Sequence, residues 1–448
     1  MRIDVSKIID NSRINKLHIT VIAVGAAVLV IDGYDLVSMG LVIPRLAEQW
    51  GVEPSSFAVA LSMAMFGVMV GSGTAGILGD YIGRRKTMLI TVFVAGFFML
   101  LTPGADSMTE LVIYRFLTGV GAGGCIPITI AYASEYMPAR ARNRLVVLMY
   151  TGAGLGSVVA GLSAPTIMAF SDWQGIFVVG GILSMLIMVL VFFVLPESLK
   201  FLISRDVDSS VAARLLKRID YSFEPKPDDE YFIAEHTHAN KGSPVQELFG
   251  DGQTSITLLA WAVMLGNQFM IFLLALWMPT LLTESGISLK ASLYILAIYN
   301  IGGVAGGIIF AGFADKMGPG RVLRITYPVA GICMVALGMS LNSIPVLVLI
   351  AIIAGAFLIG SSFCLGPFVA ALYPTRARST GIGWALSVGR IGSILSPLVG
   401  GFALAQGYEI SHILFAAGVP PILCGLIIVA LNSSISSNES KTEASQTT

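Results

Sequence analysis

Two carboxyl groups lie in the first long apolar stretch of the chain, where charged residues are scarce. Asp32 and Asp35 are three residues apart, which places both on one face of a helix with about 5–6 Å between their Cβ atoms. Because two acids this close cannot both ionise cheaply in a medium of low dielectric constant, we expect at least one to hold its proton and the pair to titrate as a unit. This is the chemistry of a proton carrier. The intervening Gly33 removes side-chain bulk and lets a substrate or a neighbouring helix approach.

The other ionisable residues inside apolar stretches are two arginines, Arg115 and Arg390. Charged groups at membrane depth are costly, so they usually face a water-filled cavity and mark a pathway. Counting about 1.5 Å per residue places Arg115 at the depth of Asp35, and Arg390 nearer the midplane. An anion that binds an arginine through its carboxylate, and changes the protonation of the acid pair, would couple a proton to a substrate. Two alternatives stay open: Arg115 neutralises Asp35 in a structural ion pair, and Arg390 snorkels to the membrane surface.

Uncharged polar side chains in the same stretches are further candidates for substrate binding. Their hydroxyl and amide groups would line a cavity and form hydrogen bonds with a bound ring, although hydrogen bonding between packed helices is the alternative explanation. These candidates are Tyr34, Asn267, Gln268 and Asn300.

Composition places these residues in a membrane protein. The 448 residues are 55% hydrophobic and 12% charged, with a mean hydropathy of +0.82, which leaves too little polar surface to coat a soluble globule of this size. The formal net charge is +0 and no basic tail appears, so we expect no nucleic-acid partner. No metal-ligand spacing, cofactor motif or Ser/His/Asp set appears either, and we therefore expect no metal, no cofactor and no enzymatic activity.

Twelve apolar segments are long enough to cross a bilayer, whose core takes about 20 residues per helix. We predict an all-α polytopic membrane protein with two six-helix pseudo-repeats, the bundles 18–195 and 253–431. An N-terminal tail (1–17), a linker (196–252) and a disordered C-terminal tail (432–448) complete the chain. The predicted spans are 18–43, 57–79, 87–103, 108–134, 145–169, 174–195, 253–283, 291–313, 322–341, 344–371, 380–404 and 409–431.

The distribution of positive charge predicts the orientation. Nearly all Lys and Arg outside the spans lie in the two tails, in the linker and in the connections from even-numbered to odd-numbered spans, whereas the opposite side carries only Arg45 and Lys290. Cytoplasmic loops are enriched in these residues, so both termini are expected in the cytoplasm. One short surface helix is expected in the linker, around residues 211–219.

Two signatures recur at nearly one spacing, which indicates a duplicated chain. Asp80 is followed three residues on by Gly83, and the same pattern returns in the second half at Asp315 and Gly318. The segment 137–142 (MPARAR) likewise returns, at almost the same offset, as YPTRAR at 373–378. A duplication with apolar flanks is typical of a transporter that has two similar membrane halves and a site between them.

The chain resembles the major facilitator superfamily over essentially its whole length. The segment 76–86 resembles the superfamily's signature between spans 2 and 3, although Tyr81 replaces the usual cation, and 196–198 (PES) resembles the motif that closes span 6. Arg115 begins a segment, RFLTG, similar to the span 4 motif linked to proton coupling. More specifically, the D-G-x-D element at 32–35 is similar to that of the aromatic acid:proton symporters, which include permeases for benzoate and hydroxybenzoates.

The resemblance implies the major facilitator fold and roles for the residues that match. Proton coupling falls to Asp32 and Asp35, and carboxylate binding or charge balance to Arg115 and Arg390. In the family the signature Asp holds a cytoplasmic gate against a helix end and its basic neighbours. The gate residues implied here, together with Arg84 and Arg140 of the two repeated signatures, are Asp80, Gly83, Glu135, Asp315 and Arg378. The second copy lacks the basic pair, so its gate contacts are expected to be weaker.

These observations predict a monomeric symporter of the bacterial inner membrane. It would bring a small aromatic carboxylate into the cell with one or more protons by alternating access, with the lipid bilayer as its surroundings. A permease for another organic anion, such as a sugar acid, a dicarboxylate or nicotinate, is an alternative. A receptor that binds aromatic acids without transporting them is a second alternative.

Overall fold

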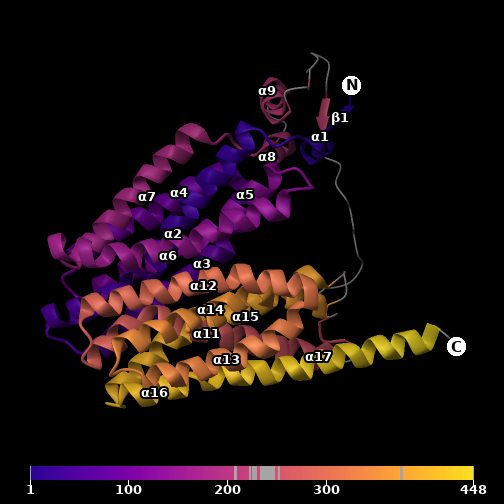
Figure 1. Ribbon diagram of the computed structural model, residues 1–448. Coiled ribbons are helices and arrows are strands. Elements are labelled where there is room, and N and C mark those ends of the chain that lie inside the picture. The colour runs from indigo at the N-terminus through magenta and orange to yellow at the C-terminus, as the bar shows by residue number, and fades with distance from the viewer. Residues whose placement is uncertain are drawn as a thin grey trace. The chain divides into compact units, whose positions relative to one another are not determined.

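A computed structural model describes most of the chain (Figure 1). The described residues are 2–205, 209–220, 223, 230–232, 248–250, 253–373 and 377–446. Twelve helices are long and apolar enough to cross a membrane, from Lys16–Trp50 to Ile410–Asn432. The prediction of an all-α polytopic membrane protein with twelve spans is therefore confirmed.

The elements before the linker begin with a short strand and a short helix, followed by six long helices. Two single-turn helices, η1 and η2, come directly before α3 and directly after α4. The bounds are β1 (Arg2–Asp4), α1 (Val5–Asn11), α2 (Lys16–Trp50), η1 (Pro54–Phe57), α3 (Ala58–Ile82), α4 (Arg84–Leu101), η2 (Thr102–Gly104), α5 (Met108–Tyr136), α6 (Arg142–Ser171) and α7 (Gln174–Val194).

The linker and the second half follow the same plan. The last predicted span is divided between α16 and the first part of α17, which then continues through the segment where the sequence predicts a disordered tail. The bounds are α8 (Leu199–Ser204), α9 (Ser209–Ile219), β2 (Glu230–Phe232), α11 (Gln253–Glu284), α12 (Leu289–Met317), α13 (Pro319–Met339), α14 (Ile344–Leu372), α15 (Arg378–Ala405), α16 (Ile410–Ala417) and α17 (Val419–Gln446).

The chain forms two compact units. Unit 1 comprises Met1–Leu36, Phe66–Ser157 and Gln174–Asn240. Unit 2 comprises Val37–Met65, Val158–Trp173 and Lys241–Thr448. The boundary crosses α2, α3 and α6, so the second part of α2, the first part of α3 and the end of α6 pack within unit 2. The division into bundles 18–195 and 253–431 stays a prediction.

The duplication is visible in how glycines bring helix backbones together. A Cβ added at Gly67 of α3 would lie 2.2 Å from the Phe116 carbonyl oxygen of α5, and one at Gly302 of α12 would lie 2.1 Å from that of Ile352 in α14. These two contacts are related by the offsets of the two repeated signatures. The contact of Gly71 with Val120 corresponds in the same way to that of Gly306 with Ala356. The contact of Gly156 with Val30 corresponds to that of Gly392 with Leu265. The two halves thus share helix packing as well as motifs.

The N-terminal segment of unit 1 is folded against the linker. Val5 and Ile9 of α1 are fully buried in a hydrophobic cluster that includes Leu216 of α9. Asp10 forms an ion pair of 2.5 Å with Arg142 at the start of α6, and β1 pairs in parallel with β2. Figure 1 shows α1, α8 and α9 gathered at one end of the long helices of this unit. The predicted linker helix is confirmed as α9, and the predicted N-terminal tail contains the structured elements β1 and α1.

Candidate functional site

The acid pair and Arg115 meet inside unit 1. Asp32 and Asp35 of α2 are 7% and 6% exposed, and Arg115 of α5 is 2% exposed. Nη2 of Arg115 donates a hydrogen bond of 2.9 Å to Oδ1 of Asp35. The sequence places Asp35 and Arg115 at one depth, and in the structure they form the ion pair that it left open as an alternative. Because both partners are buried, their attraction is little screened by solvent.

The surroundings of Arg115 make Asp35 its principal counter-charge. The guanidinium carbon lies 5.3 Å from the ring centroid of Phe177 in α7, a cation–π distance. Nε and Nη1 of Arg115 have no hydrogen-bond partner among the residues that the structure describes. Tyr34, which lies beside the acid, points elsewhere: its hydroxyl donates to the Ile176 carbonyl oxygen at 3.0 Å. A change in the charge of Asp35 therefore acts directly on Arg115.

A narrow cavity adjoins the two carboxyl groups. Its volume for the centre of a water-sized sphere is ≈ 10 Å³, and its lining includes Asp32, Asp35, Val92, Cys125 and Ser184. One water molecule needs about this much space, and it needs polar partners of the kind that the acids provide. An organic molecule does not fit beside the acids in this arrangement, whereas a proton and a water molecule do.

Gly33 serves the approach of a neighbouring helix. A Cβ at this position would lie 1.8 Å from the Ala153 carbonyl oxygen of α6. The hydroxyl of Ser157 in α6 also donates to the Gly33 carbonyl oxygen at 2.9 Å. The backbone contact between α2 and α6 therefore fixes the helix that carries the acid pair.

Replacement of Gly33 by Ala is expected to separate α2 from α6, because the obstructing atom belongs to the backbone and cannot rotate away. Overpacking of this kind costs about 1–3 kcal/mol, and the yield of folded protein and the midpoint of thermal unfolding should both fall. Gly73→Ala is the matched control, since a Cβ at Gly73 meets nothing within 4 Å. Equal unfolding midpoints for the two variants would contradict the prediction.

A second polar cluster lies inside unit 2 around Asn267 of α11. Asn267 is 3% exposed, and its Oδ1 accepts hydrogen bonds from the Tyr327 hydroxyl of α13 at 2.9 Å and from the Ser362 hydroxyl of α14 at 3.0 Å. Its Nδ2 lies 3.4 Å from Oε1 of the partly buried Gln268. The sequence places Asn267 and Gln268 together as substrate ligands, but in the structure Asn267 bonds to the protein itself.

Arg390 of α15 follows directly on Gly389, the residue that faces Gln268 along the contact between α11 and α15. A Cβ at the adjacent Gly389 would lie 3.2 Å from Cγ of Gln268. Arg390 is partly buried, and its guanidinium makes no ion pair or hydrogen bond with any residue that the structure describes. Asn300 of α12 bonds within its own helix, to the Leu296 carbonyl oxygen at 3.0 Å. Unit 2 therefore holds a cation that is available to an anionic ligand.

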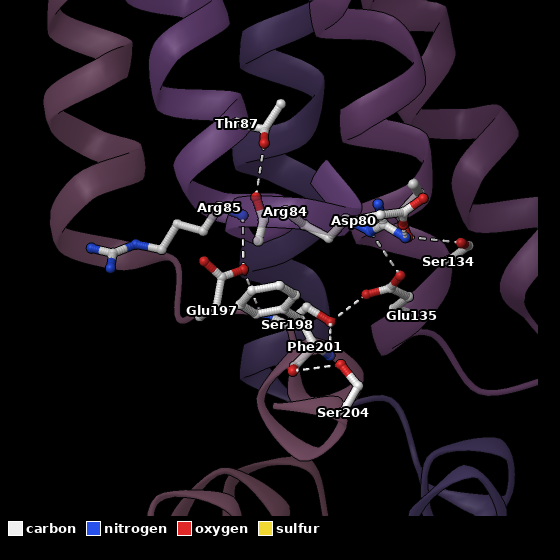
Figure 2. Close-up of polar contacts among 12 residues, drawn as sticks. Asp80, Arg84, Arg85, Thr87, Ser134, Glu135, Glu197, Ser198, Phe201 and Ser204 are labelled. Carbon is white, nitrogen blue, oxygen red and sulfur yellow. Dashed lines mark hydrogen bonds and ion pairs between the residues drawn. The ribbon is translucent and has the colours of Figure 1, made fainter. Parts of the chain in front are cut away.

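The first repeated signature forms an interhelical ion-pair cluster in unit 1 (Figure 2). Arg84 at the start of α4 contacts Asp80 of α3 at 2.6 Å and Glu135 of α5 at 3.0 Å. The second carboxyl oxygen of Glu135 accepts a hydrogen bond from the Ser198 hydroxyl, and Ser198 is the N-cap of α8. Asp80 is 70% exposed and contributes little, whereas Arg84 and Glu135 are mostly buried.

Glu197 completes this cluster and explains the glycine of the signature. Its Oε1 accepts from the backbone N–H groups of Arg85 and Ser198, both at 2.9 Å, so its negative charge lies at the N-terminus of α4. Gly83 has φ 103°, and a Cβ there would lie 2.6 Å from Oε2 of Glu197. A left-handed backbone and a close carboxylate both require glycine at this position. The sequence did not predict Glu197 and Ser198 as site residues, although both lie in the PES segment at 196–198.

The other predicted gate residues are not gathered into this cluster. Arg140 donates to the Ser12 carbonyl oxygen at 3.3 Å, within the contact between the N-terminal segment and the loop after α5. Asp315 and Arg378 of unit 2 are exposed, and neither forms an ion pair with any residue in the described ranges. The residue equivalent to Arg84 is Pro319, so the second signature has no cation in that position.

Arg84→Gln is expected to destabilise unit 1 by about 1–3 kcal/mol, because it leaves the mostly buried carboxylate of Glu135 without its cation. Thermal unfolding in detergent measures this loss. Arg144→Gln removes an exposed positive charge from α6 that forms no ion pair in the described part of the chain, and it should leave the midpoint unchanged. If both variants unfold at the wild-type midpoint, Arg84 has no stabilising role.

Comparison with known proteins extends these observations. A profile of the Major Facilitator Superfamily matches residues 25–397. The gallate transporter of Pseudomonas putida is 32% identical, with 96% of this chain and 95% of the relative covered. The benzoate transport protein of Acinetobacter baylyi is 30% identical over 96% and 92% of the two chains, and the 4-hydroxybenzoate transporter PcaK of Pseudomonas putida is 31% identical over 96% of both. Among solved structures, a D-xylose-proton symporter has a TM-score of 0.71 at 15% identity, covering 92% of this chain and 97% of that one.

Proposed function

Because the chain belongs to the Major Facilitator Superfamily, we propose that it is a transporter that imports a small aromatic carboxylate together with protons. The observation that carries the substrate class is the similarity, over at least 92% of both chains, to relatives named as gallate, benzoate and 4-hydroxybenzoate transporters. The members of this family are transporters, and no enzymatic activity is proposed. The chain is a multi-pass membrane protein.

Arg390 and Gln268 are the proposed contacts for the substrate. The guanidinium of Arg390 offers two parallel N–H donors, which match the two oxygens of a carboxylate. Gln268 faces the adjacent Gly389 along the contact between α11 and α15, and its amide would bind a hydroxyl or carboxyl group. Arg115 is the weaker candidate for the carboxylate, because its Nη2 already bonds Asp35 and the adjoining cavity admits no ring.

The acid pair is the proposed proton site. When a proton binds Asp35, Arg115 loses its counter-charge while still buried, and a buried charge without a partner is strongly unfavourable. The helices α2 and α5 then favour a different arrangement, in which Arg115 regains a partner. Protonation and helix movement are thereby coupled through one ion pair.

The Arg84 cluster is the proposed gate of the first half, at the cytoplasmic side. It ties α3, α4, α5 and the start of α8 together by charges that a conformational change can break and remake. Asp315 and Arg378 are proposed as the corresponding, weaker gate of the second half. We also propose that the protein lies in the bacterial inner membrane as a monomer with both termini in the cytoplasm.

Uptake into liposomes tests the proposal. Purified protein should accumulate labelled benzoate, 4-hydroxybenzoate or gallate when the outside is more acidic than the inside, and a protonophore should stop the accumulation. Unlabelled sugar acids, dicarboxylates and nicotinate serve as competitors that test the other organic anions. Binding in detergent without counterflow in liposomes would instead show a receptor, and failure to bind any aromatic acid would refute the substrate class.

A further inference from the structure

The polar cluster around Asn267 occupies the repeat position of the acid pair. The offset from Asp32 to Asn267 equals that from Asp80 to Asp315, and the same repeat relates the backbone contacts of α2 with α6 to those of α11 with α15. In unit 1 the acid faces a cavity, and in unit 2 the amide faces hydrogen-bond donors. The two halves therefore place different chemistry at one structural position.

One neighbour of each position corresponds in the same way. Val92 lines the cavity beside the acids, and the offset of the first signature leads from it to Tyr327. Cys125 also lines the cavity and leads to Ser361, which donates to Thr326, whereas the adjacent Ser362 donates to Asn267. Tyr327 is fully buried, and its ring fills the space that in unit 1 stays open beside the smaller Val92. Its hydroxyl donates a hydrogen bond of 2.9 Å to Asn267, whereas the side chain of the corresponding Val92 has no polar group.

We propose that Asn267, Tyr327 and Ser362 form a neutral, proton-independent copy of the acid site that positions Gln268 for the substrate. The role of Gln268 rests on the proposed function, whereas the neutrality of the copy does not. Asn267 is a positioning residue: both lone-pair positions of its Oδ1 are used by protein donors, and its Nδ2 faces Oε1 of Gln268.

The neighbourhood of the cluster keeps it neutral. Asn267 and Ser362 carry no titratable group, and Tyr327 is fully buried in a hydrophobic cluster that also contains Cys364 of α14 and Cys424 of α17. Phenol and thiol groups carry no charge in a buried apolar site at physiological pH. We therefore expect the hydrogen bonds of Asn267 not to change with pH, in contrast to those of the acid pair.

Tyr327→Phe tests the positioning role. Loss of one buried hydrogen bond loosens Asn267 and Gln268, so the KM for benzoate counterflow should rise roughly three- to tenfold. The pH dependence should keep its wild-type shape, because no titrating group is removed. Tyr299→Phe is the matched control: Tyr299 is fully buried in α12 and its hydroxyl has no hydrogen-bond partner in the described part of the chain, so its loss should leave KM unchanged. An unchanged KM in Tyr327→Phe, or a shifted pH optimum, overturns the proposal.

Asn267→Asp tests the neutrality and needs no substrate. The variant places an acid in a buried site, where the loss of hydration favours the protonated form over the ionised one. Stability should be retained at low pH and lost as pH rises past the point at which a free carboxyl group ionises, so the unfolding midpoint should fall with increasing pH more steeply than in wild type. A wild-type pH dependence of unfolding in Asn267→Asp overturns the neutral copy even if transport is never observed. Absence of benzoate transport in every variant, with the expected unfolding behaviour, contradicts only the proposed function.

Discussion

Asp35→Asn is expected to abolish proton-driven accumulation of the aromatic acid, so that the internal concentration no longer exceeds the external one. The amide cannot release a proton, and it leaves Arg115 buried without its negative partner. Removing one member of a buried ion pair costs about 3–5 kcal/mol, so a large loss of stability is expected as well. Accumulation of labelled benzoate in liposomes under an imposed pH gradient measures the transport effect, and thermal unfolding measures the loss of stability.

The double variant Asp35→Asn with Arg115→Gln separates the two effects. It removes both charges, so no buried ion is left without a partner and much of the lost stability should return. Accumulation should remain absent, because the proton site is still missing. Asp106→Asn, in the exposed connection before α5, controls for loss of an acid and should transport normally. Normal accumulation by the double variant would falsify the role of Asp35 as a proton carrier.

The twelve spans and the duplication were predictable from the sequence, because both depend on properties that act locally. A run of about 20 apolar residues must cross the bilayer as a helix wherever it occurs. Gly83 and Gly318 show why the repeated signature predicted equivalent structure. Both have positive φ values, 103° and 85°, at the same point between consecutive helices, where glycine is favoured. The shared depth of Asp35 and Arg115 followed from counting residues along each span, whereas their ion pair was only one of the alternatives that the sequence left open.

The partners of individual side chains were not predictable, because they depend on the rotation of one helix against another. Asn267 and Gln268 are adjacent in sequence and chemically similar, yet one is enclosed by Tyr327 and Ser362 while the other is only partly buried. Consecutive helical residues point about 100° apart, so a single span can offer one side chain to its own unit and the next to a ligand. The repeat offset from Val92 to Tyr327 was the one signal in the sequence for the contact between Asn267 and Tyr327. It can be interpreted only once Val92 is known to lie beside the acid pair.

Arg390→Gln is expected to weaken binding of the aromatic carboxylate by about 10- to 100-fold. Hydrogen bonds to a charged group contribute about 1.5–3 kcal/mol, and Arg390 has no ion-pair partner in the described residues to replace the substrate. Direct binding of labelled benzoate to the purified protein measures the change. Arg390→Lys keeps the charge but loses the parallel pair of donors, so its affinity should fall between those of the wild type and the Gln variant.

Two controls connect this loss to the carboxylate. Arg324→Gln removes an exposed cation from α13 and should leave affinity unchanged, which excludes a general effect of positive charge. Benzamide has the same ring without the negative charge, so whatever binding it shows should respond little to Arg390→Gln. If instead Arg390→Gln binds benzoate as the wild type does while Arg115→Gln does not, the carboxylate contacts Arg115. Arg115 would then have to exchange Asp35 for the substrate carboxylate, and the cavity beside the acids would have to widen well beyond ≈ 10 Å³ when substrate binds.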